Sequence, residues 1–263
     1  MNTLEKKMVE ILSRLRIDHG ATAVKASLEA EGILPYELLR TKEITMAAGV
    51  GMTVKIGGCE AFTDARMAKG YGVNALMAPM IESRFALEKF LTMVSGLFDA
   101  DELADMRLLI NIETLDGCEK ITQILSADNI DLLDGIVLGR TDLSAAMKVT
   151  DPDSPLLLDK AKEVFRITKQ KSIRCLIGGG ISVQTGPFIR SLAGLLDGFE
   201  TRKLVFSNFD IDYCRRDRAE LEQAIFLALE FEYCWYLRRQ EMYRPLLNED
   251  AGRIKKLAGV LGR

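Results

Sequence analysis

Seven short apolar runs recur along this chain of 263 residues, each separated from the next by a stretch with helical character. The runs are rich in leucine, isoleucine, valine and alanine, and they do not alternate apolar with polar residues. This pattern is typical of strands that are covered on both faces, as in a parallel sheet with helices on either side. The runs span residues 21–27, 52–58, 73–79, 107–113, 134–140, 173–179 and 197–206.

The segments between the runs are predicted to be helices. In the first segment, apolar residues recur at spacings of three and four, which places them on one face of a helix over residues 3–17. These residues are Leu4, Met8, Ile11, Leu12 and Leu15. Further helices are expected over 35–48, 60–70, 83–98, 117–126, 156–169 and 184–192, and the chain after about residue 211 is predicted to be helical.

Polar residues at the ends of the runs decide between two α/β folds. An open doubly wound sheet collects its site at one switch point, whereas a closed barrel carries functional groups at the C-terminal ends of all its strands. Here almost every run ends in charged residues or glycines. We therefore predict a single-domain TIM (β/α)8-type barrel over residues 1–263, with extra C-terminal helices over 211–263. The position of the eighth strand stays open.

Charge and composition restrict the kinds of partner. The net charge of −3 lacks the basic excess of nucleic-acid-binding proteins, and no segment reaches the roughly 18 apolar residues of a membrane span. The five cysteines are scattered and form no Cys-x-x-Cys pair, as is typical of reduced thiols. The N-terminal region carries acidic residues, unlike a secretory signal. We expect a cytoplasmic protein that binds neither nucleic acid nor membrane.

Two neighbouring runs end near a carboxylate, Glu113 after the fourth and Asp142 after the fifth. Two hard oxygen ligands from adjacent strands, with water and substrate in the remaining positions, are a typical site for Mg²⁺ or Mn²⁺. Asp142 is also a good candidate for a helix N-cap. Glu113 fits that alternative poorly, because Thr114 follows it and is the better capping residue.

The residues around these carboxylates resemble the HpcH/HpaI aldolase and citrate lyase beta-subunit family, within the superfamily that also contains pyruvate kinase. The resemblance is carried by INIETLDGCEKITQIL (110–125) and LDGIVLGRTDLS (133–144), and more loosely by TVKIGG (53–58) and ALMAPMIES (75–83). It covers about residues 20–148. It implies a barrel whose divalent metal is held by Glu113 and Asp142.

The resemblance also implies an activity and an assembly. Members cleave or form carbon–carbon bonds next to the carbonyl of a small 2-oxo acid such as pyruvate, through an enolate. The family often forms trimers or hexamers with C-terminal helices exchanged between subunits, so we expect a homo-oligomer in which residues 211–263 take part in exchange.

Several positions depart from the family pattern. Lys55 stands where the family has a substrate-binding arginine, and a lysine cannot grip a carboxylate in the same bidentate way. The histidine of the aldolase branch is absent, and His19 is the only histidine in the chain. Asn111 stands where pyruvate kinase has a lysine, which argues against that enzyme's phosphoryl transfer.

Other candidate site residues follow from their positions at strand ends. Lys25 and Lys55 lie within apolar runs, so each is expected to meet an anionic substrate or a structural partner such as Glu29, Glu31 or Glu200. These two lysines are candidate catalytic residues, together with Arg140. Candidate substrate-binding residues are Glu29, Arg202, Gly179 and Gly180. The glycines are equally explained by tight packing, and Arg202 by a salt bridge with Glu200.

The leading hypothesis is a divalent-metal-dependent aldolase or lyase that acts on a 2-oxo acid. Two other enzymatic readings are a phosphoenolpyruvate-using transferase and a Schiff-base aldolase with Lys25 or Lys55 as nucleophile. A barrel that has lost catalysis and serves as a binding protein is the non-enzymatic alternative.

Overall fold

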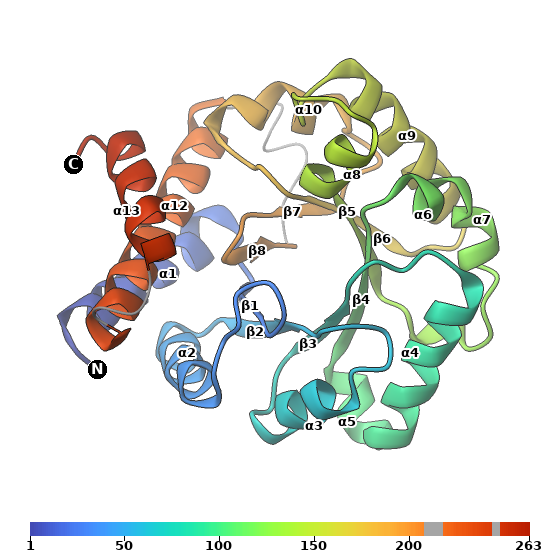
Figure 1. The fold of residues 1–263 in the computed structure, drawn as a ribbon, viewed down its shortest axis with the longest axis horizontal. Helices are drawn as coiled ribbons and strands as arrows, with labels where there is room; N and C mark the ends of the chain where they lie inside the picture. The colour runs from blue at the N-terminus through green and yellow to red at the C-terminus, as the bar shows by residue number, and fades with distance from the viewer. Residues whose placement is uncertain (208–217, 244–247) are drawn as a thin grey trace.

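Eight strands close into one barrel in the order in which they follow along the chain. The computed structural model describes residues 1–207, 218–243 and 248–263. Figure 1 shows the strands surrounding the centre and the helices forming an outer layer. The strands are β1 (Ala23–Ser27), β2 (Gly51–Lys55), β3 (Ala75–Ala78), β4 (Arg107–Ile112), β5 (Gly135–Gly139), β6 (Arg174–Gly178), β7 (Gly198–Glu200) and β8 (Leu204–Phe206). The predicted barrel is confirmed.

The eighth strand lies inside the seventh apolar run. β7 and β8 have three residues each and are joined by the turn at 201–203, in which the Thr201 amide donates to the Leu204 carbonyl at 2.9 Å. β8 therefore pairs antiparallel with both β7 and β1, whereas the other seven strands are parallel. The prediction of a parallel sheet is correct for seven strands and wrong for β8. Two three-residue strands joined by a three-residue turn without glycine or proline have the length and pattern of one strand.

The helices follow the predicted alternation with local differences. The segment predicted at 117–126 forms two short helices, and the one at 184–192 begins with a 3₁₀ turn. The helices are α1 (Thr3–His19), α2 (Pro35–Ala48), α3 (Phe62–Gly70), α4 (Arg84–Leu97), α5 (Ala100–Asp105), α6 (Leu115–Glu119), α7 (Ile121–Ile124), α8 (Arg140–Ala146), α9 (Pro155–Lys169), α10 (Gly186–Ser191), α12 (Arg218–Tyr243) and α13 (Asn248–Val260). Among the described residues, no helix is long and apolar enough to cross a membrane.

Apolar side chains fill the middle of the barrel. They come from six strands and form a cluster separate from the larger core between strands and helices. The members are Ala23, Ala75, Met77, Leu109, Val137, Leu176 and Val205. This layer divides the two mouths of the barrel from each other, as in other barrels of this class.

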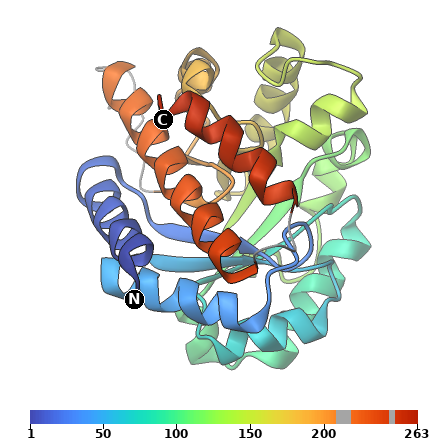
Figure 2. The same cartoon turned by 60° about the vertical axis from the view of Figure 1, so that its left-hand side comes forward.

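The C-terminal helices pack on the N-terminal helix of the same chain. α12 contacts α1, and α13 contacts α12. Figure 2 shows these three helices side by side on one flank of the barrel. Exchange of the 211–263 segment between subunits stays a prediction, and residues 211–217 and 244–247 of that segment lie outside the described part of the chain.

A buried carboxylate, Glu5, joins three helices on this flank. Its side chain is 1% exposed and accepts hydrogen bonds from Arg40 Nε of α2 at 3.1 Å and from Arg238 Nε of α12 at 3.0 Å. Burial opposes its ionisation, but the hydrogen bonds from Arg40, Asn2 and Arg238 outweigh burial and lower its pKa from 4.5 to about 2. Glu5 therefore stabilises the fold only while it is charged.

Glu5→Gln is expected to destabilise the protein. A pKa lowered in the folded state contributes stability above pH 4.5 that is lost as the pH falls toward about 2. The free energy of unfolding at neutral pH should fall by about 3 kcal/mol, and the difference from wild type should shrink across that acidic range. Urea unfolding at several pH values measures this. The control is Glu43→Gln, which also loses a contact with Arg40 but at an exposed site, and equal effects of the two variants would contradict the prediction.

Candidate active site at the C-terminal mouth of the barrel

Two glutamates face each other across two glycines in one layer of the barrel. The strand registers align Gly139 with Gly178, and they place Glu113 beside Gly139 and Glu200 beside Gly178. A Cβ atom at Gly139 would lie 2.6 Å from the Cβ of Glu113, and one at Gly178 would lie 2.9 Å from Glu200 Oε1. The side chains of Glu113 and Glu200 thus fit only because Gly139 and Gly178 have no side chain of their own.

Hydrogen bonds hold Glu113 at the end of β4. Its side chain is 3% exposed. The Asn111 amide donates to Oε2 at 2.9 Å, the backbone N–H of Met80 donates to Oε1 at 3.1 Å, and Lys55 Nζ lies 3.4 Å from Oε1. Thr114 caps α6, as the sequence indicated, so Glu113 has no capping role. A buried carboxylate that is oriented in this way is suited to binding a cation or a substrate.

Asp142 lies next to Glu113 from the following strand end. It stands in the first turn of α8, whose N-cap is Gly139, so the alternative that Asp142 is the capping residue is wrong. Partial burial raises the pKa of Asp142, the negative charge of Glu113 and a hydrogen bond between the two carboxyl groups raise it further, and Lys55 acts in the opposite direction. The two acidic side chains therefore repel each other unless a proton or a cation lies between them.

The donor set at this point fits a divalent cation. Asn111 donates to Oε2 of Glu113, Asp142 contacts Glu113 directly, and Asp142 is exposed at the mouth, so both carboxylates can present an oxygen to one cation. A cation between them would relieve the repulsion that raises the pKa of Asp142. No cluster of three or more potential protein ligands occurs in the described ranges, so further coordination would come from water and substrate.

The two lysines of the mouth each have a glutamate partner. Lys55 pairs with Glu113, and Lys25 forms a close ion pair with Glu200. Both lysine side chains are mostly buried, at 16% and 14% exposure. The sequence offered Glu29, Glu31 and Glu200 as structural partners of Lys25, and the partner in the structure is Glu200.

Arg140 is fully buried beneath this mouth. Its guanidinium makes a close ion pair with Asp153, donates to the Gly179 carbonyl at 2.8 Å and lies over the ring of Phe188. Burial lowers its pKa despite the charge of Asp153. The guanidinium thus joins the start of α8 to the glycine turn after β6, where it fixes the backbone that carries Asp142.

The glycine turn packs against α8. Gly179 has a φ of +77° and Gly180 a φ of +63°, and a Cβ at Gly179 would lie 2.6 Å from the Thr141 amide nitrogen. Tight packing therefore accounts for Gly179. A role for either glycine in substrate binding stays a prediction.

Two further candidates lie at the rim. Glu29 is exposed in the turn after β1. Arg202 lies in the β7–β8 turn, where its Nε is 3.3 Å from Glu31 and its guanidinium is near the ring of Tyr236. One interpretation of the sequence paired Arg202 with Glu200. In the structure Arg202 pairs with Glu31 instead. The reason is that the strand ends at Glu200 and the chain turns before Arg202.

Sequence reasoning missed two residues that the structure brings to the mouth. Asn111 appeared only as a departure from a related enzyme, and Glu200 appeared only as a possible structural partner of Lys25, Lys55 or Arg202, not as a site residue. Counting every second residue from Leu109 along β4 would have found Asn111 on the inner face. The Lys25 partner was not decidable from the sequence, since Glu200 is 175 positions away.

His19 lies far from this mouth along the strand direction. It is the last residue of α1 and precedes the N-terminal end of β1. It is 8% exposed, and burial lowers its pKa. The chain thus has no histidine at the C-terminal ends of its strands.

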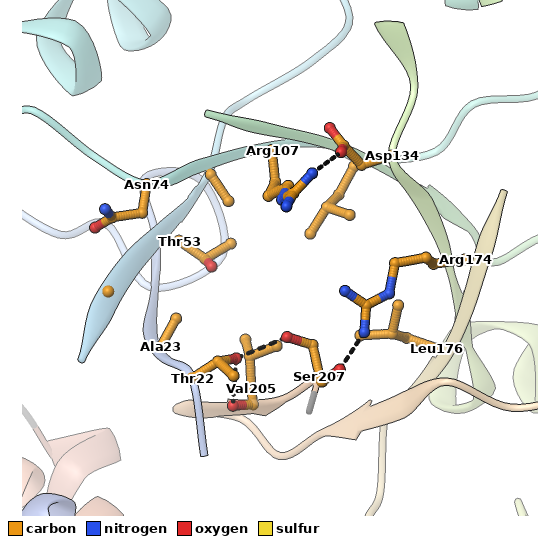
Figure 3. A pocket seen from close by; sticks show the side chains of 13 residues that line it. Thr22, Ala23, Thr53, Asn74, Arg107, Asp134, Arg174, Leu176, Val205 and Ser207 are labelled. Carbon is orange, nitrogen blue, oxygen red and sulfur yellow. Dashed lines mark hydrogen bonds and ion pairs between the residues drawn. The ribbon is translucent and has the colours of Figure 1, made fainter. Parts of the chain in front are cut away.

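The opposite mouth of the barrel contains a cavity of about 210 Å³. Figure 3 shows Arg107 paired with Asp134 on its wall, Arg174 directed to the Ser207 carbonyl, and Thr22 in contact with Ser207. Thr22, Arg107, Asp134 and Arg174 lie at or near the N-terminal ends of parallel strands, and Ser207 follows the C-terminal end of the antiparallel β8. The apolar layer of the barrel separates this cavity from Glu113 and Asp142, so it does not belong to the candidate active site.

Solved structures of low sequence identity share the fold. An HpcH/HpaI aldolase from Desulfitobacterium hafniense DCB-2 is 14% identical, with a TM-score of 0.59 over 85% of this chain and 89% of the other. An HpcH/HpaI aldolase/citrate lyase family protein from Burkholderia cenocepacia J2315 is 15% identical, with a TM-score of 0.59 over 85% and 98%. The citrate lyase beta subunit from M. tuberculosis, complexed with oxaloacetate and magnesium, is 15% identical, with a TM-score of 0.50 over 81% and 92%.

Sequence comparison identifies the family. No curated protein matches the chain. A family model described as HpcH/HpaI aldolase/citrate lyase matches residues 37–178, more than half of the chain, and this range contains Lys55, Glu113 and Asp142. The resemblance noted in the sequence is thus confirmed, and the chain belongs to the HpcH/HpaI aldolase/citrate lyase family.

Proposed function

We propose that this protein is a divalent-metal-dependent carbon–carbon lyase or aldolase that acts on a 2-oxo acid through a pyruvate-type enolate. The observation that carries the proposal is the meeting of Glu113 and Asp142 at the C-terminal mouth, beside Lys55. The family membership supports it. The citrate lyase beta subunit from M. tuberculosis binds oxaloacetate, which is a 2-oxo acid, and magnesium, which is a divalent cation. These are the substrate class and the kind of metal that we propose for this protein.

Glu113 and Asp142 would hold Mg²⁺ or Mn²⁺. When bound there, the cation supplies Lewis-acid polarisation of a keto oxygen and a template for a chelating substrate. The cation and Lys55 together carry three positive charges, and Glu113 and Asp142 carry two negative charges. The net charge of the site would therefore be +1. The mouth would therefore attract a singly charged anion such as pyruvate.

Lys55 and Lys25 would bind and orient this anion. The Lys55 ammonium group lies 3.4 Å from Glu113, so it can approach a substrate carboxylate beside the cation. An ammonium group neutralises a carboxylate without the fixed fork of an arginine, so we expect weaker orientation of the substrate than an arginine would give. Arg202, Glu29 and the amides of Gly179 and Gly180 are candidates for contacts with the rest of the substrate, and Arg140 acts by positioning α8.

The test is the exchange of the pyruvate methyl hydrogens with deuterium. Protein is stripped with EDTA, Mn²⁺ is titrated back, and exchange is followed by NMR while Mn²⁺ binding is measured by calorimetry. We expect exchange that appears only with the cation and saturates with its binding. Wild-type protein that neither binds Mn²⁺ in the presence of oxalate nor exchanges pyruvate would contradict the proposal.

The alternatives give different results in the same assay. A Schiff-base aldolase would exchange without metal, and borohydride with pyruvate would leave a stable adduct on Lys25 or Lys55. A non-catalytic binding barrel would bind oxalate and Mn²⁺ without exchange. A phosphoenolpyruvate-using transferase would consume phosphoenolpyruvate in the presence of an acceptor.

A further inference from the structure

Glu200 is a buried carboxylate with one oxygen that has no partner. Its side chain is 2% exposed. Oε1 makes the ion pair with Lys25, while Oε2 has no hydrogen-bond partner among the described residues. An unsatisfied oxygen of a buried charged group costs free energy, and Glu200 Oε2 differs from the other such carboxylate oxygens because its strand end lies at the candidate active site.

The surroundings of Glu200 differ from those of Glu113. Glu113 accepts hydrogen bonds on both oxygens, which hold it in one orientation. Glu200 is held on one oxygen only, and the missing side chain at Gly178 gives its carboxylate room. The two glutamates share a layer and differ in one respect: Glu113 is fixed for binding, and Glu200 keeps an oxygen ready to accept a proton.

The ion pair with Lys25 stabilises the charged form of Glu200 in its buried position. An isolated carboxylate at 2% exposure would be strongly destabilising, and the paired ammonium offsets its charge. If a proton moves from a substrate to Glu200, the negative charge moves to the substrate, where the same ammonium can stabilise it. Lys25 thus holds Glu200 and compensates the negative charge before and after the transfer.

We propose that Glu200, held by Lys25, is the general base and acid of the reaction, in the absence of a histidine at this mouth. The proposal rests on the proposed function. In enolate formation from pyruvate, a methyl C–H bond breaks, the proton goes to Glu200 Oε2, and the electron pair forms the C=C bond while the carbonyl π electrons move to the oxygen. In cleavage of a 4-hydroxy-2-oxo acid, Glu200 would take the C4 hydroxyl proton, the O–H electron pair would form the aldehyde C=O bond, and the C3–C4 bond would break to leave the pyruvate enolate. Glu200 would then return the proton to C3, so pyruvate forms and the carboxylate is regenerated.

Glu200→Gln and Glu200→Ala test this role in the deuterium-exchange assay with Mn²⁺ and pyruvate. We expect Glu200→Gln to lose at least about 100-fold in exchange rate, the range of general-base catalysis. Mn²⁺ affinity should stay within about threefold of wild type, because Glu113 and Asp142 are intact. Added formate should restore part of the exchange to Glu200→Ala, since it can occupy the vacated space as a base. Glu163→Gln on the outer helix α9 is the matched control and should behave as wild type.

The outcomes separate this inference from the proposed function. Absence of exchange in wild type would overturn both. Exchange by Glu200→Gln within threefold of wild type would overturn the role of Glu200 and leave the proposed function standing. A loss in Glu200→Gln accompanied by loss of Mn²⁺ binding, or a loss in Glu200→Ala that formate does not relieve, would make Glu200 a structural residue and overturn the proposal.

Discussion

Glu113→Gln and Asp142→Asn are each expected to weaken Mn²⁺ binding by more than about 100-fold and to remove pyruvate exchange. Each change keeps the shape of the side chain and deletes one of the two negative charges that face the cation. Loss of a residue that only orients a ligand commonly costs about 10- to 100-fold in metal affinity, so loss of the ligand itself should cost more. Calorimetry with Mn²⁺ and NMR exchange measure the two effects on the same samples.

Two further variants sharpen this prediction. Asn111→Leu removes the amide that donates to Glu113 at 2.9 Å, and it should weaken Mn²⁺ binding by an intermediate factor of about 10 to 100. Asp116→Asn changes an exposed aspartate on α6 that pairs with Lys120, and it should leave affinity and exchange as in wild type. Wild-type affinity in Glu113→Gln or Asp142→Asn would show that the two carboxylates are structural.

Lys203→Met is expected to cause a large loss of stability. Lys203 is 2% exposed, its Nζ lies 2.6 Å from Glu31 Oε2, and it stands over the ring of Trp235. Burial lowers the pKa of Lys203, and the charge of Glu31 opposes this effect. Removing the lysine leaves a buried carboxylate, so the free energy of unfolding should fall by about 3 to 5 kcal/mol. Urea denaturation monitored by circular dichroism measures it.

A double-mutant cycle distinguishes loss of charge pairing from loss of packing. Lys203→Met combined with Glu31→Gln removes both charges, and the double variant should be more stable than Lys203→Met alone. Arg202→Gln is the control, because Arg202 also contacts Glu31 but is 44% exposed, and its change should cost less than about 1 kcal/mol. Additive effects of Lys203→Met and Glu31→Gln would contradict a coupled buried pair.

Much of the fold, and the meeting of Glu113 with Asp142 at one mouth, could be predicted from the sequence. The spacing of apolar residues reports which side of a segment is buried, and this is why the barrel, its first seven strands and most helices were correct. Thr114 as the cap of α6 followed from local chemistry in the same way. The placement of Glu113 and Asp142 at neighbouring strand ends followed from the alternation, because parallel strands bring their C-terminal ends to one mouth.

The sequence by itself thus determined the class of fold, the family and the two carboxylates. Only the tertiary structure decided the antiparallel β8, the burial of Arg140 and the pairing of Lys25 with Glu200. The physical reason is the distance along the chain between the residues that interact. Periodicity and capping depend on residues within a few positions of each other, whereas barrel closure sets the register between strands and joins residues as distant as Lys25 and Glu200, 175 positions apart.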